Sequence, residues 1–208
     1  MPLFGSVANQ FLKKGWKTKN LELTDHPVQS RPVRNVSDMP PHILSPKTHL
    51  KRAGGYFDLE MFEEADRELR AIPEEEPWLK KKKVFRIAIF QELKDWANMR
   101  VLARELRFLY PNEEDWWISD AFASRRSESI EEARKILLDG LALHYESAII
   151  RYNLACYACV LGHPGECLDF LKEAVRRDEK YKQMALEDED LSAVKEALLR
   201  MGWSSKLV

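Results

Sequence analysis

Apolar residues recur at spacings of three and four through the middle of the chain, which is the period of one face of an α-helix. The clearest stripes lie on either side of a Gly-His-Pro-Gly break at 162–165: Tyr152, Ala155, Cys156 and Cys159 before it, and Cys167, Leu168, Leu171 and Ala174 after it. Glycine and proline end such periodic stretches. The pattern therefore predicts pairs of amphipathic helices joined by short turns.

These stripes come into register when the chain is shifted by 34 residues. Four columns of small and aliphatic side chains then align: Ala53, Ile87, Ala121 and Ala155; Ala65, Met99, Ala133 and Cys167; Leu69, Ala103, Leu137 and Leu171; and Ile72, Leu106, Gly140 and Ala174. Small residues at matching positions let two antiparallel helices approach closely. A single pair of this kind cannot bury its apolar surface, so neighbouring pairs are expected to stack.

A period of 34 with a small residue in each of two helices, an aromatic residue between them and proline near the end resembles the tetratricopeptide repeat (TPR) family. The resemblance implies an all-α fold, a right-handed α-solenoid of helix-turn-helix repeats. The four repeats would occupy about 46–79, 80–113, 114–147 and 148–181. An N-terminal strap at 1–45 and a C-terminal capping helix at 182–208 would flank the repeat region, 46–181.

The sequence departs from the family pattern in one column. The position that usually holds leucine in the first helix is charged in three repeats: Arg52, Arg86 and Asp120, with Leu154 alone conforming. We expect these helices to be rotated or to carry a polar inner surface. In the third repeat, Ser129 and Glu132 predict a capping box at the start of the second helix.

Composition and charge exclude several classes of protein. The chain has 208 residues, 45% of them hydrophobic, and a formal net charge of −1. A charge so near zero gives no overall electrostatic reason to bind nucleic acid. No apolar run is long enough to predict a membrane span, and no secretory or organellar signal is recognisable, so we expect a cytoplasmic protein.

The two ends of the chain carry their own patterns. Residues 4–12 form a short amphipathic stripe followed by lysines, and residues 21–44 combine prolines with aliphatic side chains, as an extended peptide would. Docking of residues 1–45 on the chain's own repeats is the preferred interpretation; a membrane-surface helix and an unstructured leader are the alternatives. Near the other end, the acidic run 187–190 predicts the start of a helix that Gly202 ends.

Cysteine spacing offers one candidate chemical site. Cys156, Cys159, His163 and Cys167 form a C-x2-C-x3-H-x3-C pattern, which could hold zinc or form a redox pair. Cys167 occupies a small-residue column, so we expect it in the seam between helices and not beside the other two. Plain packing is therefore preferred, and no metal is expected. Catalytic templates are absent from the sequence, which predicts no enzymatic activity and no cofactor.

The resemblance also implies where a partner binds, because first helices of the family line a concave groove. The positions expected to line it are Leu50, Phe57, Val84, Gln91, Ile118, Phe122, Arg125, Tyr152, Asn153 and Cys156. The Lys/Asn clamp with which some members hold a terminal carboxylate is missing. Aromatic and aliphatic anchors favour an apolar or helical peptide, although Phe122 and Tyr152 have packing between helices as the alternative role.

Together these patterns predict a non-catalytic protein-interaction adaptor that binds a protein or peptide partner. The alternative, from another class, is a metal- or redox-sensing helical module built on the three cysteines and His163.

Overall fold

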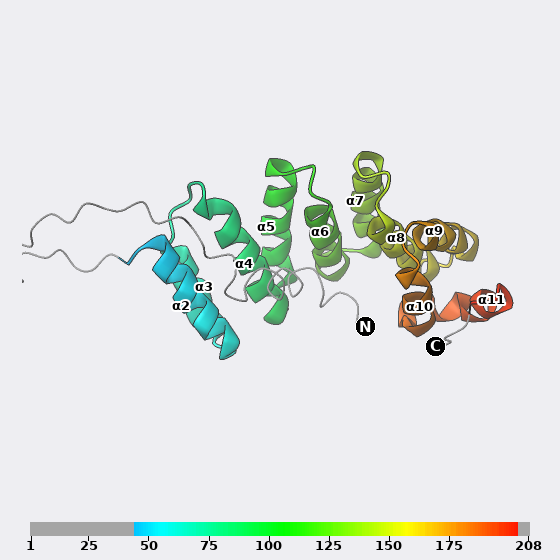
Figure 1. Ribbon diagram of the computed structural model, residues 1–208, viewed down its shortest axis with the longest axis horizontal. Helices are drawn as coiled ribbons and strands as arrows, with labels where there is room; N and C mark the ends of the chain where they lie inside the picture. Colours follow the sequence, from blue (N-terminus) through cyan, green and yellow to red (C-terminus); the bar gives the residue numbers. More distant parts are fainter. Residues whose placement is uncertain (1–43, 204–208) are drawn as a thin grey trace, which may run out of the picture. The chain divides into compact units, whose positions relative to one another are not determined.

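The structure, a computed structural model, describes residues 44–203, and this part of the chain is helical without any strand (Figure 1). The all-α prediction is confirmed. In order, the helices are α2 (Pro46–Asp58), α3 (Phe62–Arg70), α4 (Trp78–Glu92), α5 (Trp96–Leu109), α6 (Glu114–Ser127), α7 (Ile130–Leu143), α8 (Ala148–Val160), α9 (Pro164–Arg177), α10 (Lys180–Glu187), the 3₁₀ helix η3 (Glu189–Val194) and α11 (Lys195–Arg200). The predicted strap at 1–45 lies outside the described residues except for its last two.

The described chain divides after Leu93 into two compact units, which we describe separately. The N-terminal unit contains α2–α4 and the C-terminal unit contains α5–α11. Within residues 44–203, every helix is too short or too polar to cross a lipid bilayer.

Side chains just before the helices fix where several of them begin. The Ser45, Asp95 and Ser147 side chains each accept a hydrogen bond from the backbone amide three residues on, at the starts of α2, α5 and α8. Ser129 Oγ accepts from the backbone amide of Glu132 at 3.1 Å and starts α7 in the same way. These bonds satisfy amides that the first helical turn leaves without a partner.

The residues aligned by the 34-residue period form the core of both units. Every non-glycine member of the four columns is at most 2% exposed, and Gly140 is also buried. A β-carbon on Gly140 would lie 3.1 Å from the Trp117 side chain, so glycine is what allows α7 to approach α6 there. The small residues act as spacers that set how closely paired helices pack.

The charged residues in the leucine column are neutralised across helix seams. Arg86 Nε of α4 donates to Asp66 Oδ1 of α3 at 2.6 Å, and Arg100 of α5 lies 3.5 Å from Asp120 of α6. Asp66 and Arg100 occupy equivalent positions 34 residues apart, and so do Arg86 and Asp120. The second ion pair is therefore the first with its charges exchanged. Arg52, the third exception, lies 3.0 Å from Glu68.

Asp120 is the most deeply buried of these acids, with 1% of its surface exposed. Burial raises the pKa of its carboxyl above the ordinary value, against the opposing effect of Arg107 and Arg100. Arg107 Nε lies 3.2 Å from Asp120 Oδ2, so two guanidinium groups compensate one carboxylate. A buried charge is tolerated only with such partners.

The capping element after α9 differs in detail from the single helix expected at 182–208. Three short helices, α10, η3 and α11, take its place. The acidic run does not begin a long helix, because Asp188 has an extended backbone and its side chain caps η3 by accepting from the amide of Asp190 at 3.0 Å. Buried Leu191, Val194 and Leu198 join the core of the C-terminal unit.

Replacing Ala133 with tryptophan tests the spacer role. Ala133 is fully buried in α7, so the larger ring must strain the seam, and we expect a loss of about 1–3 kcal/mol in the free energy of unfolding. Urea denaturation followed by circular dichroism measures it. The matched control is Lys135→Trp, since that side chain is 71% exposed in the same helix; its effect should stay within about 0.5 kcal/mol. Equal effects would show that the column is not a tight seam.

Exchanging charges tests the seam ion pairs. Arg86→Asp would place two carboxylates together and leave Asp66 with Arg70, which donates to its other carboxylate oxygen at 2.7 Å, as its remaining partner, so we expect a cost of about 1–3 kcal/mol. The double variant Asp66→Arg/Arg86→Asp recreates the polarity of the Arg100–Asp120 pair and should recover most of that loss. Thermal and urea unfolding of the four proteins form a double-mutant cycle. Additive losses in the double variant would contradict a direct pairing.

Candidate binding surfaces

In the N-terminal unit, three of the four positions predicted to line a groove are engaged in packing. Leu50 and Val84 are 3% and 4% exposed. The Phe57 ring packs edge-on against Phe62 and Phe85, with centroids 5.3 and 5.6 Å away. Gln91 alone is a half-buried polar side chain near the end of α4. These four positions do not form an open apolar surface within the unit.

In the C-terminal unit, Ile118 and Phe122 of α6 are likewise buried, at 1% and 6% exposure. Phe122 lies between the Trp96 ring, 5.6 Å away, and the Arg126 guanidinium, 3.5 Å from its centroid. The alternative role in helix packing therefore fits Phe122 better than a role as a ligand anchor.

Tyr152, Asn153 and Cys156 of α8 are also buried, and two of them contact the chain's own C-terminal segment. The Tyr152 ring stacks on Tyr181 of α10 at 4.9 Å, and its hydroxyl donates to Asp188 Oδ2 at 2.9 Å. Cys156 Sγ lies 3.6 Å from the same carboxylate oxygen. Asn153 turns back on its own helix and donates to the Ile149 carbonyl at 2.9 Å.

Arg125 of α6 completes this contact. Its two terminal nitrogens donate to the two oxygens of Asp190 at 2.6 and 3.0 Å, a bidentate pair, and its guanidinium lies 5.2 Å from the Tyr157 ring centroid. Burial opposes the charge on Arg125, but the hydrogen bonds and the negative charge of Asp190, with smaller contributions from Tyr157 and Cys156, together raise the pKa of the guanidinium. We call the surface formed by Tyr152 and Cys156 of α8 together with Arg125 of α6 the α8 face. Residues Asp188–Leu191 of the chain cover it.

The cysteines are arranged differently from the zinc pattern. Cys159 and Cys167 are close enough to hydrogen-bond, which corrects the expectation that Cys167 lies apart: its column faces α8, where Cys159 sits. His163 is exposed at the start of α9. In the described range, the one group with metal-ligand spacing is Cys156 with Asp188 and Asp190, whose carboxylates already bind Tyr152 and Arg125.

Burial also makes these thiols poor nucleophiles. Burial and the neighbouring Asp188 carboxylate raise the pKa of Cys156 well above its ordinary value. Burial and Cys159 raise the pKa of Cys167. Because the thiolate is the reactive form, neither residue has the features of a redox sensor.

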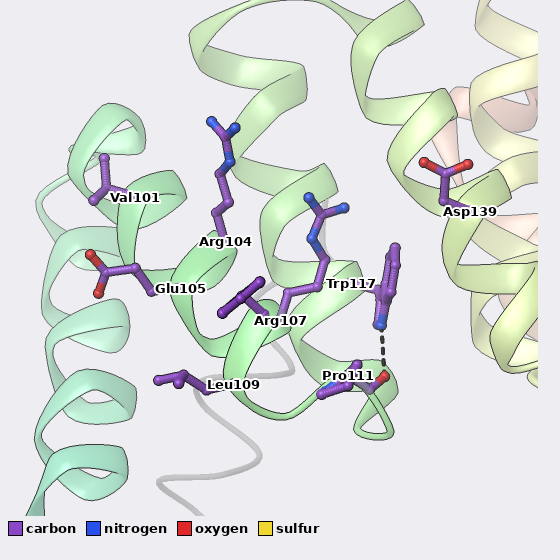
Figure 2. A pocket seen from close by; sticks show the side chains of 9 residues that line it. Val101, Arg104, Glu105, Arg107, Leu109, Pro111, Trp117 and Asp139 are labelled. Carbon is purple, nitrogen blue, oxygen red and sulfur yellow. Dashed lines mark hydrogen bonds between the residues drawn. The ribbon is translucent and has the colours of Figure 1, made fainter.

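An open apolar surface of the C-terminal unit lies elsewhere, in a groove formed by α5, the turn after it, α6 and α7. It encloses about 900 Å³ and we call it the outer groove (Figure 2). Its lining residues are Val101, Arg104, Glu105, Arg107, Phe108, Leu109, Pro111, Trp117 and Asp139. Phe108 is 84% exposed and Val101 55%, an unusual exposure for side chains of this kind.

Several side-chain contacts hold the wall of the outer groove. Trp117 Nε1 donates to the Pro111 carbonyl at 2.9 Å, as Figure 2 shows, and the Arg107 guanidinium lies 4.7 Å from the Trp117 ring centroid. His144 Nε2 lies 3.0 Å from the same carbonyl. Arg107 also pairs with buried Asp120, so the groove wall is tied to the core ion pair.

Sequence reasoning missed this groove because it followed the buried columns. A signal was present: Val101 and Phe108 lie seven residues apart, two helical turns, on the face of α5 away from Met99, Ala103 and Leu106. A second apolar stripe on a helix whose first stripe is already buried indicates an interaction surface.

Comparison with known proteins supports the repeat architecture. No family model matches this sequence, and a search of curated proteins finds no match. Among solved structures, MamA of AMB-1 superposes with a TM-score of 0.52 at 14% identity, covering 65% of this chain and 79% of its own. MamA of MSR-1 gives 0.55 at 15% identity over 68% and 82%, and a further MamA structure gives 0.58 at 11% identity over 78% and 97%.

MamA is a helical-repeat protein of the tetratricopeptide type. The chain has a TPR-like fold. At this level of identity the likeness establishes architecture alone, in agreement with the 34-residue period and the solenoid it predicts.

Alkylation rates test whether the C-terminal segment covers Cys156. Asp190→Ala removes a bidentate charged pair, and hydrogen bonds of that class contribute roughly 1.5–3 kcal/mol, so we expect Cys156 to react with iodoacetamide at least about ten-fold faster. Mass spectrometry of the native chain over time resolves each cysteine. Asp169→Ala, which disrupts the exposed pair with Lys172, serves as the control. An unchanged Cys156 rate would show that Asp190 does not hold the segment down.

Proposed function

We propose that this chain is a non-catalytic adaptor that binds a helix of a partner protein in the outer groove. The observation that carries the proposal is the exposure of Phe108, Val101 and Leu109, at 84%, 55% and 47%, in the lining of this groove. Exposed aromatic and aliphatic side chains gathered in one concave surface are typical of protein-interaction sites.

The charges at the rim favour an amphipathic ligand. Arg104 lies on the α5 side of the groove and Asp139 on the α7 side (Figure 2), and both are exposed. A helix whose apolar residues recur at i, i+3, i+4 and i+7 could fill the groove and place an acidic residue near Arg104 and a basic one near Asp139. Such pairs would set the orientation of the ligand more than its affinity.

The first-helix positions predicted as a concave binding groove support this proposal less well. Ile118, Phe122 and Tyr152 are buried in the C-terminal unit, and Arg125 is paired with Asp190. A partner that used this face would first have to displace part of the chain. The outer groove needs no such rearrangement.

The metal- or redox-sensing alternative finds little support in the same contacts. Cys156, Cys159 and Cys167 are buried, and His163 is exposed. The raised thiol pKa values of Cys156 and Cys167 further disfavour reactivity. We therefore propose packing as the role of all three cysteines.

Charge insertion into the groove tests the adaptor proposal. Phe108→Asp should abolish retention of at least one protein that the wild-type chain retains from its native cell extract, because a carboxylate would be buried against the bound helix. The side chain is 84% exposed, so stability should change by no more than about 0.5 kcal/mol. Quantitative mass spectrometry of the retained proteins is the measurement.

Tyr145→Asp is the matched control, because Tyr145 is 67% exposed and lies outside the groove. A protein lost with Phe108→Asp and kept with Tyr145→Asp identifies a partner of the outer groove. Equal retention of every protein by both variants and the wild type would contradict the proposal.

A further inference from the structure

Residues Asp188–Leu191 contact the α8 face as a bound peptide would. Each of the two aspartates meets a side-chain donor from a helix far away in the sequence: Tyr152 for Asp188 and Arg125 for Asp190. The intervening residue, Glu189, is the least buried of the three acidic residues 188–190. The contacts with Tyr152 and Arg125 are therefore made by the two aspartates on either side of this exposed residue.

The donors of the α8 face suit carboxylates in particular. Arg125 presents two parallel N–H groups to Asp190, a geometry that matches both carboxylate oxygens. Its side chain is 12% exposed, so the pair is only weakly screened by salt. Tyr152 contributes a hydroxyl donor, and Cys156 contributes a weak S–H donor to the same oxygen of Asp188.

An apolar contact follows directly after the acidic residues. Leu191 is fully buried in the core that α8 and α9 help to form, and Val194 three residues later is 2% exposed. The pattern that contacts the surface is thus an acidic residue, an exposed residue, an acidic residue and an aliphatic residue. It recognises an internal segment and does not require a chain terminus.

We propose that the α8 face is a second binding surface, specific for a partner segment of the pattern acidic-x-acidic-aliphatic, and that Asp188–Leu191 occupy it as an internal competitor. The contacts within the chain show the chemistry of the ligand, because Arg125 and Tyr152 would offer the same donors to an external segment. The proposal is independent of the outer groove, which lies on other residues.

Occupation by a segment of the same chain lowers the apparent affinity for any external ligand. A tethered segment acts at an effective concentration on the order of millimolar, so a free peptide must exceed that to compete. Substitutions that weaken the contacts of the internal segment should therefore make the α8 face accessible to an external peptide. The resulting gain in peptide affinity measures how strongly the internal segment competes.

The experiment uses a fluorescein-labelled peptide with the sequence of residues 186–194 and the full-length chain. Fluorescence anisotropy compares the wild type with Asp188→Ala/Asp190→Ala, in which the internal carboxylates are removed and the site remains. We expect the double variant to bind the peptide at least about ten-fold more tightly. Adding Arg125→Gln to the double variant should abolish that gain, and a peptide with both aspartates changed to asparagine should not bind.

Equal affinity of wild type and double variant overturns the proposal, and so does binding that survives Arg125→Gln. A second measurement uses only the wild type, whose fold is not in question. Hydrogen exchange in the presence of unlabelled peptide at about ten times the effective concentration should accelerate at residues 188–194 and stay unchanged in α5. No acceleration at 188–194 would also overturn it.

Discussion

Close contact between paired helices is the constraint on which the rest of this structure depends. The small residues that recur every 34 positions are buried throughout, and they bring the helices near enough for the larger side chains to close the core. Gly140 shows how strict the requirement is, because even a β-carbon there would press on Trp117. Trp117 in turn forms the wall of the outer groove. The spacing of the core thus decides the form of an exposed surface.

The same seams hold charges that a repeat of this kind usually lacks. A carboxylate such as Asp120 cannot be buried alone, so its presence requires cations from the neighbouring helix. Arg107 meets that requirement and also lies over the Trp117 ring. Arg107 therefore belongs both to the buried ion pair and to the outer groove. A substitution of Asp120 would alter the position of Arg107 in the groove, although the Asp120 side chain itself is buried.

The sequence predicted the helices and the buried columns, since both follow from local periodicity. It could not predict which segments of the chain pack on the first helices. The contacts of Asp188 with Tyr152 and of Asp190 with Arg125 join residues 36 and 65 positions apart, beyond the reach of any periodic pattern. The acidic run predicts a helix start, and η3 does begin at Glu189, but the pattern does not show that the two aspartates also bind distant side chains. The exchanged ion pairs could have been found, because Asp66 and Arg86 are 20 residues apart and so are Arg100 and Asp120.

Those two pairs give the repeats a fixed order. Asp66 of α3 pairs with Arg86 of α4, and Arg100 of α5 pairs with Asp120 of α6. Deleting the intervening 34 residues would bring Asp66 against Asp120, and duplicating them would bring Arg100 against Arg86, so either rearrangement would confront like charges in a buried seam. Loss or gain of whole units is a common route by which repeat arrays change length. In this array the sign of the charges alternates from one repeat to the next. Opposite charges therefore meet only when each repeat lies beside its present neighbour.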